Sequence, residues 1–323
     1  MYNLGFDIGG TKCAVILGNV TDSCEIGDII VEKRVFPTDS ARGPYAVTDE
    51  LFATAEAILD GRSLTAKDVS AIGISCGGPL DAKKGLIQSP PNLPGWDDIP
   101  IVEMTERRFG VRTVLQNDAN ACAVAEWRFG AGRGKRNMIF LTFGTGMGAG
   151  LILDGKLYSG TNDLAGEVGH MRLAEDGPEG YGKRGSFEGF CSGGGIARLG
   201  ERMLLQAKEN GVPTALEKEE KLTAKTIALT AKAGDAVAKA VYNESARRLG
   251  QGLSLLIDLL NPEAIVIGSI YARDTALFRD TVLDVIKKET LPLAGNACEI
   301  LPAALSENIG DIAALSLVMG GNV

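Results

Sequence analysis

Two glycine-rich segments contain residue types that could bind phosphate groups. The first reads Asp7-Ile8-Gly9-Gly10-Thr11-Lys12. Glycine allows the backbone to approach an anion closely, and successive amides in a tight turn can point at it. The Thr11 hydroxyl and the Lys12 ammonium would add donors for phosphate oxygens, and Asp7 could hold Mg²⁺, usually through water. The pair Gly9-Gly10 alone would also suit a plain hairpin turn without a ligand.

The second segment is Gly144-Thr145-Gly146-Met147-Gly148-Ala149-Gly150, in which every other residue is glycine. Each glycine loses more conformational entropy on folding than any other residue, and a simple turn does not need four of them. A phosphate cradle made of backbone amides would explain this composition. The structural alternative is a β-bulge or a tightly packed barrel corner.

A carboxylate follows a predicted strand and opens a predicted helix at Asn117-Asp118. The helix dipole stabilises a carboxylate at that position, so Asp118 should be ionised at neutral pH. An ionised, oriented carboxylate suits phosphoryl transfer to a hydroxyl, because the transition state is loose and positioning dominates. The alternative is that Asp118 only caps the helix.

Side chains suited to sugar hydroxyls occur in Ala165-Gly166-Glu167-Val168-Gly169-His170 and at Glu188. Carboxylates and imidazole can form hydrogen bonds to neighbouring hydroxyl groups. A metal site or a surface loop are the alternatives. His170 is the only histidine and Cys191 is the nearest thiol, which argues against a closed zinc site.

These segments must be positioned by strands and helices. Apolar runs at residues 2–8 and 12–17 flank the first glycine turn and predict a hairpin. Rossmann and P-loop turns lead from a strand into a helix instead. Runs at 138–143 and 149–153 flank the second turn in the same way, and Asp154-Gly155 predicts a further hairpin turn. This recurrence predicts two similar halves that face each other across a cleft.

The remaining pattern alternates strands and helices, which is typical of α/β proteins. Strands are predicted at residues 69–75, 111–115 and 264–267. A helix is predicted at 119–127, with Asn117, Asp118 or Asn120 as its N-cap. A long amphipathic helix is predicted through 237–260, and Asn261-Pro262 ends it. The charge-rich residues 208–221 predict a solvated helix or loop.

The composition excludes several classes of function. The chain has 323 residues, of which 45% are hydrophobic and 23% charged, as in soluble globular proteins of one large or two domains. A net charge of −8 disfavours binding to nucleic acid. We find neither an apolar run that could span a membrane nor the pattern of a signal peptide. Six scattered cysteines predict buried free thiols and a cytoplasmic location.

Together the motifs resemble the ROK family (repressor, open reading frame, kinase) of bacterial sugar kinases, in order and over essentially the whole chain. Asp7–Lys12 and Gly144–Gly150 are similar to its two phosphate motifs, and Asn117-Asp118-Ala119-Asn120 is similar to its catalytic motif. Ala165–His170 matches the Ala-Gly-Glu-x-Gly-His signature. Two further segments are similar to its Gly-Pro-Gly turn and its Asn-Leu-x-x-Trp segment, at Ile74–Asp81 and Asn92–Trp96.

The resemblance implies an actin-like ATPase (ribonuclease H-like) α/β fold, whose two domains close on a sugar and MgATP. We expect a small N-terminal domain at 1–117, with a C-terminal helix at about 308–323 packing back on it, and a larger domain at 118–307. Asp118 would be the base for the acceptor hydroxyl, usually on C6 of a hexose. The residues implied to hold the other hydroxyls are Asn92, Asn117, Glu167, His170 and Glu188. Those implied to bind phosphate or nucleotide are Gly9, Gly10, Thr11, Lys12, Thr145, Gly146 and Gly268, with Asp7 near Mg²⁺.

Two features depart from the family pattern. Members commonly carry a structural zinc, bound by the signature histidine and by three cysteines in Cys-x-Cys-x₄-Cys. Here the cysteine positions hold Glu179, Tyr181 and Ser186, so we predict no zinc. The loop before Glu188 must then be held by packing, with Tyr181 and Phe187 as candidates. The turn after the late strand is Gly268-Ser269-Ile270, where the family usually has more glycine, which weakens the expected nucleotide site there.

The leading hypothesis is a cytoplasmic, ATP-dependent kinase of a hexose or N-acetylhexosamine, which uses Mg²⁺ and forms a homodimer or homotetramer as the family often does. A sugar-responsive transcriptional regulator is one alternative. Such relatives carry an N-terminal helix-turn-helix domain, whereas here the phosphate motif starts at Asp7. A non-catalytic sugar-binding protein is the other alternative, motivated by the missing zinc ligands and the altered Gly268 turn.

Overall fold

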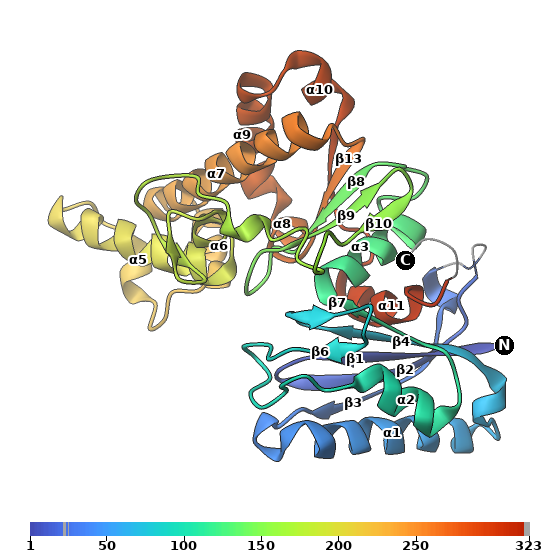
Figure 1. The fold of residues 1–323 in the computed structure, drawn as a ribbon. Coiled ribbons are helices and arrows are strands. Elements are labelled where there is room, and N and C mark those ends of the chain that lie inside the picture. Colours follow the sequence, from blue (N-terminus) through green and yellow to red (C-terminus); the bar gives the residue numbers. More distant parts are fainter. Residues whose placement is uncertain (22–23, 25, 320–323) are drawn as a thin grey trace. The chain divides into compact units, whose positions relative to one another are not determined.

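The computed structural model describes residues 1–21, 24 and 26–319, and Figure 1 shows its elements. Contacts divide the chain into two compact units. Unit 1 comprises residues 1–136, 150–165 and 304–323, and unit 2 comprises 137–149 and 166–303. This division differs from the predicted boundary at 117/118, because helix α3 (Asp118–Phe129) belongs to unit 1.

Unit 1 is built on a five-stranded sheet in the order β3-β2-β1-β4-β7. Strands β1 (Tyr2–Ile8), β2 (Lys12–Gly18) and β3 (Ile30–Pro37) are antiparallel neighbours, which confirms the predicted hairpin at Gly9-Gly10. Strands β4 (Val69–Cys76) and β7 (Thr113–Asn117) run parallel to β1. Strand β7 lies two residues later than the predicted 111–115.

Two short hairpins complete the strands of unit 1. Strands β5 (Leu80–Asp81) and β6 (Leu86–Ile87) pair with each other. Strands β9 (Ala149–Leu153) and β10 (Lys156–Tyr158) form the hairpin predicted at Asp154-Gly155. Both turn residues of that hairpin have positive φ, as its tight turn requires.

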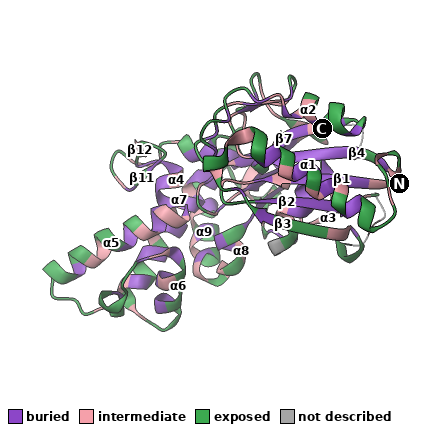
Figure 2. Cartoon of the chain, turned by 90° about the horizontal axis from the view of Figure 1, so that it is seen from below, coloured by how far each residue is buried: buried purple, intermediate pink, exposed green. Residues whose placement is uncertain are grey.

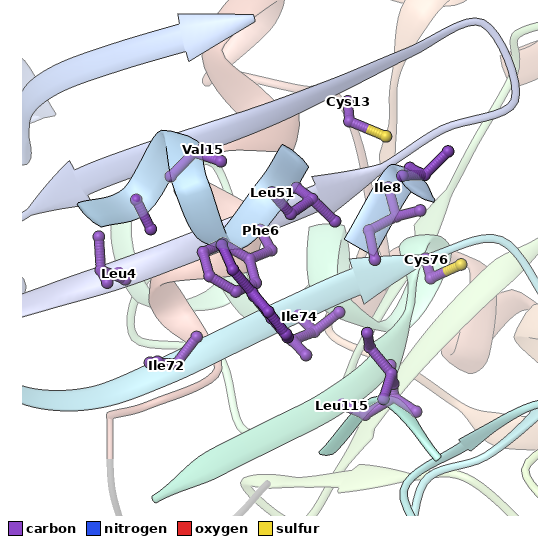
Figure 3. Packing of buried hydrophobic residues seen from close by; sticks show 14 of the residues in the cluster. Leu4, Phe6, Ile8, Cys13, Val15, Leu51, Ile72, Ile74, Cys76 and Leu115 are labelled. Carbon is purple, nitrogen blue, oxygen red and sulfur yellow. The ribbon is translucent and has the colours of Figure 1, made fainter. Parts of the chain in front are cut away.

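Helices cover both faces of the main sheet because side chains alternate along each strand. Cys13, Val15 and Leu17 of β2 point into a core shared with helices α1 (Gly43–Gly61) and α2 (Ile101–Phe109). Figure 3 shows this core, with side chains of the sheet around Leu51 of α1. Ala14 and Ile16 point to the opposite face, against α3 and helix α11 (Ile309–Ser316). In Figure 2 the strands β1, β2 and β4 are mostly buried, whereas the edge strand β3 is largely exposed and the helices expose one side.

Helix α11 lies unusually close to the sheet. A Cβ atom at Gly73 of β4 would lie 1.9 Å from the carbonyl oxygen of Ala314, and one at Gly18 of β2 would lie 2.4 Å from a Leu315 methyl carbon. Glycine at these positions therefore permits the packing of α11. The helix begins at Ile309 and ends at Ser316, and residues 320–323 of the predicted C-terminal helix lie outside the described residues.

Unit 2 contains three parallel strands, β8 (Met138–Leu141), β13 (Ala264–Ile267) and β14 (Glu299–Pro302), with β13 in the middle. The predicted long helix is α7 (Ala236–Leu260), which Asp235 caps and Asn261 ends in a left-handed conformation. The other helices are α4 (Phe187–Phe190), α5 (Gly193–Glu209), α6 (Ala224–Lys232), α8 (Ser269–Arg273), α9 (Thr275–Glu289) and α10 (Pro292–Ala297). Helices α5, α6 and α9 all pack against α7.

The structure can be compared with the predictions about membrane spans and cysteines. Within residues 1–21, 24 and 26–319, no helix is long and apolar enough to cross a membrane. All six cysteines are free thiols; Cys13, Cys76 and Cys191 are buried as predicted, whereas Cys24, Cys122 and Cys298 are partly exposed.

Candidate active site

Several predicted site residues of unit 1 meet at one edge of its sheet. Strands β1, β4 and β7 are parallel, and Ile8 pairs with Cys76, which in turn pairs with Asn117. Their carboxyl ends therefore lie side by side, and so do the glycine turn after β1 and the Asn117-Asp118 segment after β7. Ligands of α/β proteins bind in such a position, outside the carboxyl ends of the strands.

The first glycine turn is held in place by backbone and side-chain contacts. The Gly9 amide donates to the Lys12 carbonyl oxygen at 3.1 Å, and the Thr38 hydroxyl donates to the Gly9 carbonyl oxygen at 2.5 Å. The side chains of Thr11 and Lys12 are exposed, as binding to a phosphate requires. The predicted phosphate turn is therefore preorganised.

Asn92, which is implied to bind sugar, lies directly against this turn. A Cβ atom at Gly10 would be 2.5 Å from the Asn92 carbonyl oxygen and 2.8 Å from the Asn92 Cβ. Only glycine fits at that distance. The structure thus brings a predicted sugar residue and the predicted phosphate turn together.

Asp118 opens helix α3, but Asn117 is the cap. The Asn117 side-chain oxygen accepts from the Asn120 amide at 2.8 Å, whereas Asp118 Oδ1 accepts from the Ala119 amide at 2.8 Å. The interpretation of Asp118 as a helix cap is therefore wrong. Capping uses the Asn117 oxygen, which limits the hydrogen bonds that this side chain can offer to a sugar.

The charge of Asp118 is controlled by more than the helix terminus. The side chain keeps access to solvent, but the protein packed around its carboxyl group desolvates it. This desolvation raises the pKa of Asp118, and the hydrogen bond from the Ala119 amide opposes the rise only in part. The helix dipole, which is all that the sequence indicates at Asp118, acts in the opposite direction and lowers the pKa. A raised pKa makes the carboxylate a stronger base.

Asp7 lies in a cluster of charged side chains on the α11 side of the sheet. Burial raises the pKa of Asp7 to about 6, and the negative charges of Asp311 and Asp118 add to the rise. Lys33 and Lys12 oppose it. Asp311 is buried and pairs with Lys33 at 2.6 Å, and a Cβ atom at neighbouring Gly310 would lie 3.1 Å from Asp7 Oδ2. The sequence motifs identified Asp7, but they did not indicate the ion pair between Lys33 of β3 and Asp311 of α11.

In unit 2, the second glycine turn lies at the carboxyl end of β8. Its sides are joined by a hydrogen bond of 3.0 Å from the Thr142 amide to the Gly148 carbonyl oxygen. The Gly268 amide donates to the Leu141 carbonyl oxygen at 2.9 Å, and the Ile270 amide to that of Phe143 at 2.9 Å. The two predicted nucleotide segments of this unit, around Thr145 and after β13, are therefore neighbours.

The signature segment and Glu188 adjoin the same turn. Glu188 Oε2 accepts from the Met147 amide at 3.0 Å. A Cβ atom at Gly169 would lie 2.3 Å from the Met147 carbonyl oxygen, so the segment that carries Glu167 and His170 passes close to the turn. Both of these side chains are exposed.

The loop at the expected cysteine positions is held by ordinary protein contacts. The short strands β11 (Glu179–Gly180) and β12 (Lys183–Arg184) pair, and Ser186 caps α4 by accepting from the Gly189 amide at 3.1 Å. Phe187 is fully buried, as predicted. Tyr181 is exposed and contacts the His170 ring, with ring centroids 5.3 Å apart, so its predicted part in packing is small. In the described residues, no group of three or more His, Cys, Asp or Glu side chains could hold a metal ion.

A cavity of about 1000 Å³ borders the second glycine turn within unit 2. Its walls come from the turn, the start of α5, the segment around α6 and the region of α8. The lining residues include Gly144, Thr145, Gly193, Gly194, Lys221, Lys225, Leu229, Lys232, Ile270, Arg273 and Asp274. A nucleoside fits such a volume. Gly268 itself does not line the cavity, whereas the helix that follows it does. The sequence predicted Gly144 and Thr145 as part of the phosphate turn but not the lining residues of α5, α6 and α8, although the run Gly193-Gly194-Gly195 was a signal.

The altered turn after β13 keeps the conformation that glycine favours. Ser269 has φ 50°, in the left-handed region that is unfavourable for serine. We predict that Ser269→Gly stabilises the protein, by about 1 kcal/mol from relief of this strain. Urea unfolding would measure the change. Ala at the same position should not stabilise, and equal stability of the Gly and Ala variants would contradict the prediction.

Comparisons with known proteins identify the family of the chain, a related enzyme and a related structure. A family model described as the ROK family matches residues 3–320. The glucokinase of Halalkalibacterium halodurans is 32% identical over 317 residues, covering 96% of this chain and 93% of that protein. The crystal structure of a ROK family glucokinase from Streptomyces griseus, in complex with glucose and AMPPNP, has a TM-score of 0.73 and 31% identity and covers 99% of this chain and 100% of that one. The predicted actin-like ATPase fold is thereby confirmed.

A relative of another kind is also similar. The xylose repressor of Caldicellulosiruptor bescii is 28% identical over 288 residues, which cover 89% of this chain and 70% of the repressor. The similarity to glucokinases and the similarity to this repressor thus both extend over most of the chain.

Proposed function

The chain belongs to the ROK family, and from this premise we propose that it is an ATP-dependent sugar kinase. It would transfer the γ-phosphoryl group of ATP to a hydroxyl, at C6, of a hexose or N-acetylhexosamine. The main support for the proposal is that Asp7, the Gly9–Lys12 turn and Asp118 lie close together at one edge of the unit 1 sheet. The similarity to glucokinases supports it and makes glucose the first candidate substrate.

In this proposal Asp118 accepts the proton of the acceptor hydroxyl. The Asp118 side chain keeps access to solvent and so to a substrate, and its raised pKa makes the carboxylate a stronger base for the hydroxyl proton. The residues proposed to hold the other sugar hydroxyls, as the family resemblance implies, are Asn92, Asn117, Glu167, His170 and Glu188. Positioning by these groups lowers the barrier because the phosphoryl transition state needs alignment more than covalent chemistry.

The phosphates and the nucleoside are assigned to the two glycine turns and the cavity. Gly9, Gly10, Thr11 and Lys12 provide amide, hydroxyl and ammonium donors, and Thr145 and Gly146 provide donors from unit 2. The cavity bordered by Thr145, Gly193 and Ile270 takes the nucleoside. Gly268 acts indirectly by shaping the turn into α8.

Asp7 is the residue proposed to hold Mg²⁺. Carboxylate oxygen suits this ion, which usually keeps several waters and is bound through one or two carboxylates plus substrate phosphates. The negative charges of Asp118 and Asp311 near Asp7 fit a cation there. Bound Mg²⁺ would neutralise charge on the phosphates during transfer.

A coupled assay of ADP release with MgATP and a panel of sugars tests the proposal. The panel should contain glucose, mannose, fructose, allose, N-acetylmannosamine and N-acetylglucosamine. We expect sugar-dependent ADP release with at least one of them. ADP release that no sugar stimulates would count against a sugar kinase.

The cluster around Asp7 gives a prediction about pH. Ionised Asp7 is needed for Mg²⁺, so kcat/KM for MgATP should fall as the pH is lowered through about 6. Asp311→Asn removes one charge that raises the pKa of Asp7 and leaves Lys33, which lowers it. The fall should therefore move to lower pH in this variant. A pH profile of kcat/KM would measure it, and a shift to higher pH would contradict the assignment.

A sugar-responsive regulator is the second candidate, favoured by the similarity to the xylose repressor. The net charge of −8 argues against DNA binding. A gel shift with operator-like DNA separates the two candidates. Sugar-sensitive and salt-sensitive binding of that DNA, together with no ADP release, would favour the regulator.

A further inference from the structure

We propose that Glu188 is a positioning residue for the second glycine turn and so for the phosphates of the nucleotide. The family resemblance implies only a contact with the sugar for this residue. The inference rests on the proposed function, because it concerns the same site. It makes Glu188 a link between the sugar residues of unit 2 and the phosphate turn.

The Gly146–Met147 peptide is fixed at both ends. Its carbonyl oxygen, on Gly146, accepts from the Gly144 amide at 3.1 Å, and its amide, on Met147, donates to Glu188 Oε2 at 3.0 Å. A hydrogen bond to a charged acceptor is stronger than one between neutral groups. The orientation of this peptide therefore depends on Glu188. Because the peptide is joined to the preceding residues, the direction of the Thr145 and Gly146 amides depends on Glu188 as well.

The carboxylate lies tightly against the turn. A Cβ atom at Gly146 would be 2.8 Å from Glu188 Oε2, so glycine is what allows the approach. The alternating glycines of this turn are therefore explained in part by protein packing as well as by a phosphate. Two backbone bonds hold the start of the turn, from Gly193 to Gly144 at 2.7 Å and from Ile270 to Phe143 at 2.9 Å. Glu188 adds a side-chain contact at Met147.

Glu188 itself is held rigidly. Ser186 caps the short helix α4, and the neighbouring Phe187 is fully buried. A Cβ atom at Gly252 of α7 would lie 2.4 Å from the Phe187 ring, which places that ring against the long helix. A side chain supported in this way can transmit the position of α4 to the turn.

The signature segment reaches the same point. The Glu188 Cβ would lie 3.3 Å from a Cβ atom at Gly169, and Gly169 also adjoins the Met147 carbonyl oxygen. Glu167, His170 and Glu188 thus stand on segments that meet at Met147. A change at Glu188 should therefore affect nucleotide binding even when no sugar is present.

Calorimetric titration with Mg²⁺ and AMPPNP, without sugar, tests this inference on the full chain. We expect Glu188→Ala to weaken AMPPNP binding about tenfold or more, because the Met147 amide loses its charged acceptor. Glu188→Gln keeps an acceptor oxygen at the same reach and should restore binding to within about threefold of the wild type. Glu209→Ala, which removes an exposed glutamate at the end of α5, is the matched control and should leave sugar-free AMPPNP binding unchanged.

The outcomes separate this inference from the proposed function. Wild-type affinity of Glu188→Ala for AMPPNP, with a raised KM for sugar, would overturn the positioning role and leave the kinase proposal intact. No binding of AMPPNP to the wild-type chain would instead count against the kinase proposal. Should Glu188→Ala fail to fold, Glu188→Asp takes its place. Its shorter side chain should weaken binding relative to Glu188→Gln, and equal affinities of the Asp and Gln variants would overturn the inference.

Discussion

Replacing Asp118 with asparagine should lower turnover by about 10²–10⁴-fold while sugar binding stays close to that of the wild type. The carboxylate is the proposed acceptor of the hydroxyl proton, and an amide cannot take that proton. Asparagine keeps an oxygen for the Ala119 amide, and Asn117 remains the cap of α3. The variant should therefore fold normally. Steady-state ADP release and sugar titration by calorimetry would measure the two effects.

A matched control is Asp60→Asn, which changes an exposed carboxylate on α1 of the same unit. It should turn over substrate like the wild type. Near-normal turnover of Asp118→Asn would refute the assignment of the base. Loss of sugar binding together with a lower melting temperature would indicate a structural role for Asp118 instead.

Replacing Gly73 with alanine should destabilise unit 1 by about 3 kcal/mol or more, at the upper end of the usual effect of overpacking. The new Cβ would lie 1.9 Å from the Ala314 carbonyl oxygen, and the backbone of α11 would have to move away. Gly310 and Asp311 of that helix lie near Asp7, so the displacement should also disturb the charged cluster. Urea unfolding, followed by circular dichroism, would give the change in free energy.

Gly27→Ala is the control for this variant, because a Cβ at Gly27 meets no heavy atom within 4 Å. Its free energy of unfolding should stay within about 0.5 kcal/mol of the wild type. Wild-type stability of Gly73→Ala would mean that α11 does not pack on β4 as described.

The strands and helices that depend on local pattern were predictable. Apolar runs around Gly9-Gly10 predicted the hairpin of β1 and β2, and helical spacing predicted α7. The family resemblance predicted that a C-terminal helix packs back on the N-terminal domain, but the close approach of α11 to β4 was not predictable, because it depends on a contact between Gly73 and Ala314, which are far apart in sequence. Pattern within one segment gives no information on which distant segment will cover it.

The candidate site shows the same limit. Motifs identified Asp7, Asp118 and both glycine turns, because each motif is contiguous. The cavity beside Thr145 is assembled from separate segments, and no single segment indicates it. The rise in the pKa of Asp118 could not be predicted for a related reason, since desolvation arises from neighbours that only the fold brings together. The bond from Glu188 to Met147 likewise joins two motifs that the sequence presents apart.

Phosphorus NMR of the protein with MgATP and glucose would show directly whether it phosphorylates a sugar through Asp118. We predict that ADP and a sugar phosphate appear in equal amounts, and that both are lost with Asp118→Asn. Glucose is used first because the similar kinases are glucokinases, and the other hexoses and N-acetylhexosamines follow. Unchanged ATP in the presence of every one of these sugars, at concentrations at which a sugar binds, would show that the protein is not a kinase of these sugars.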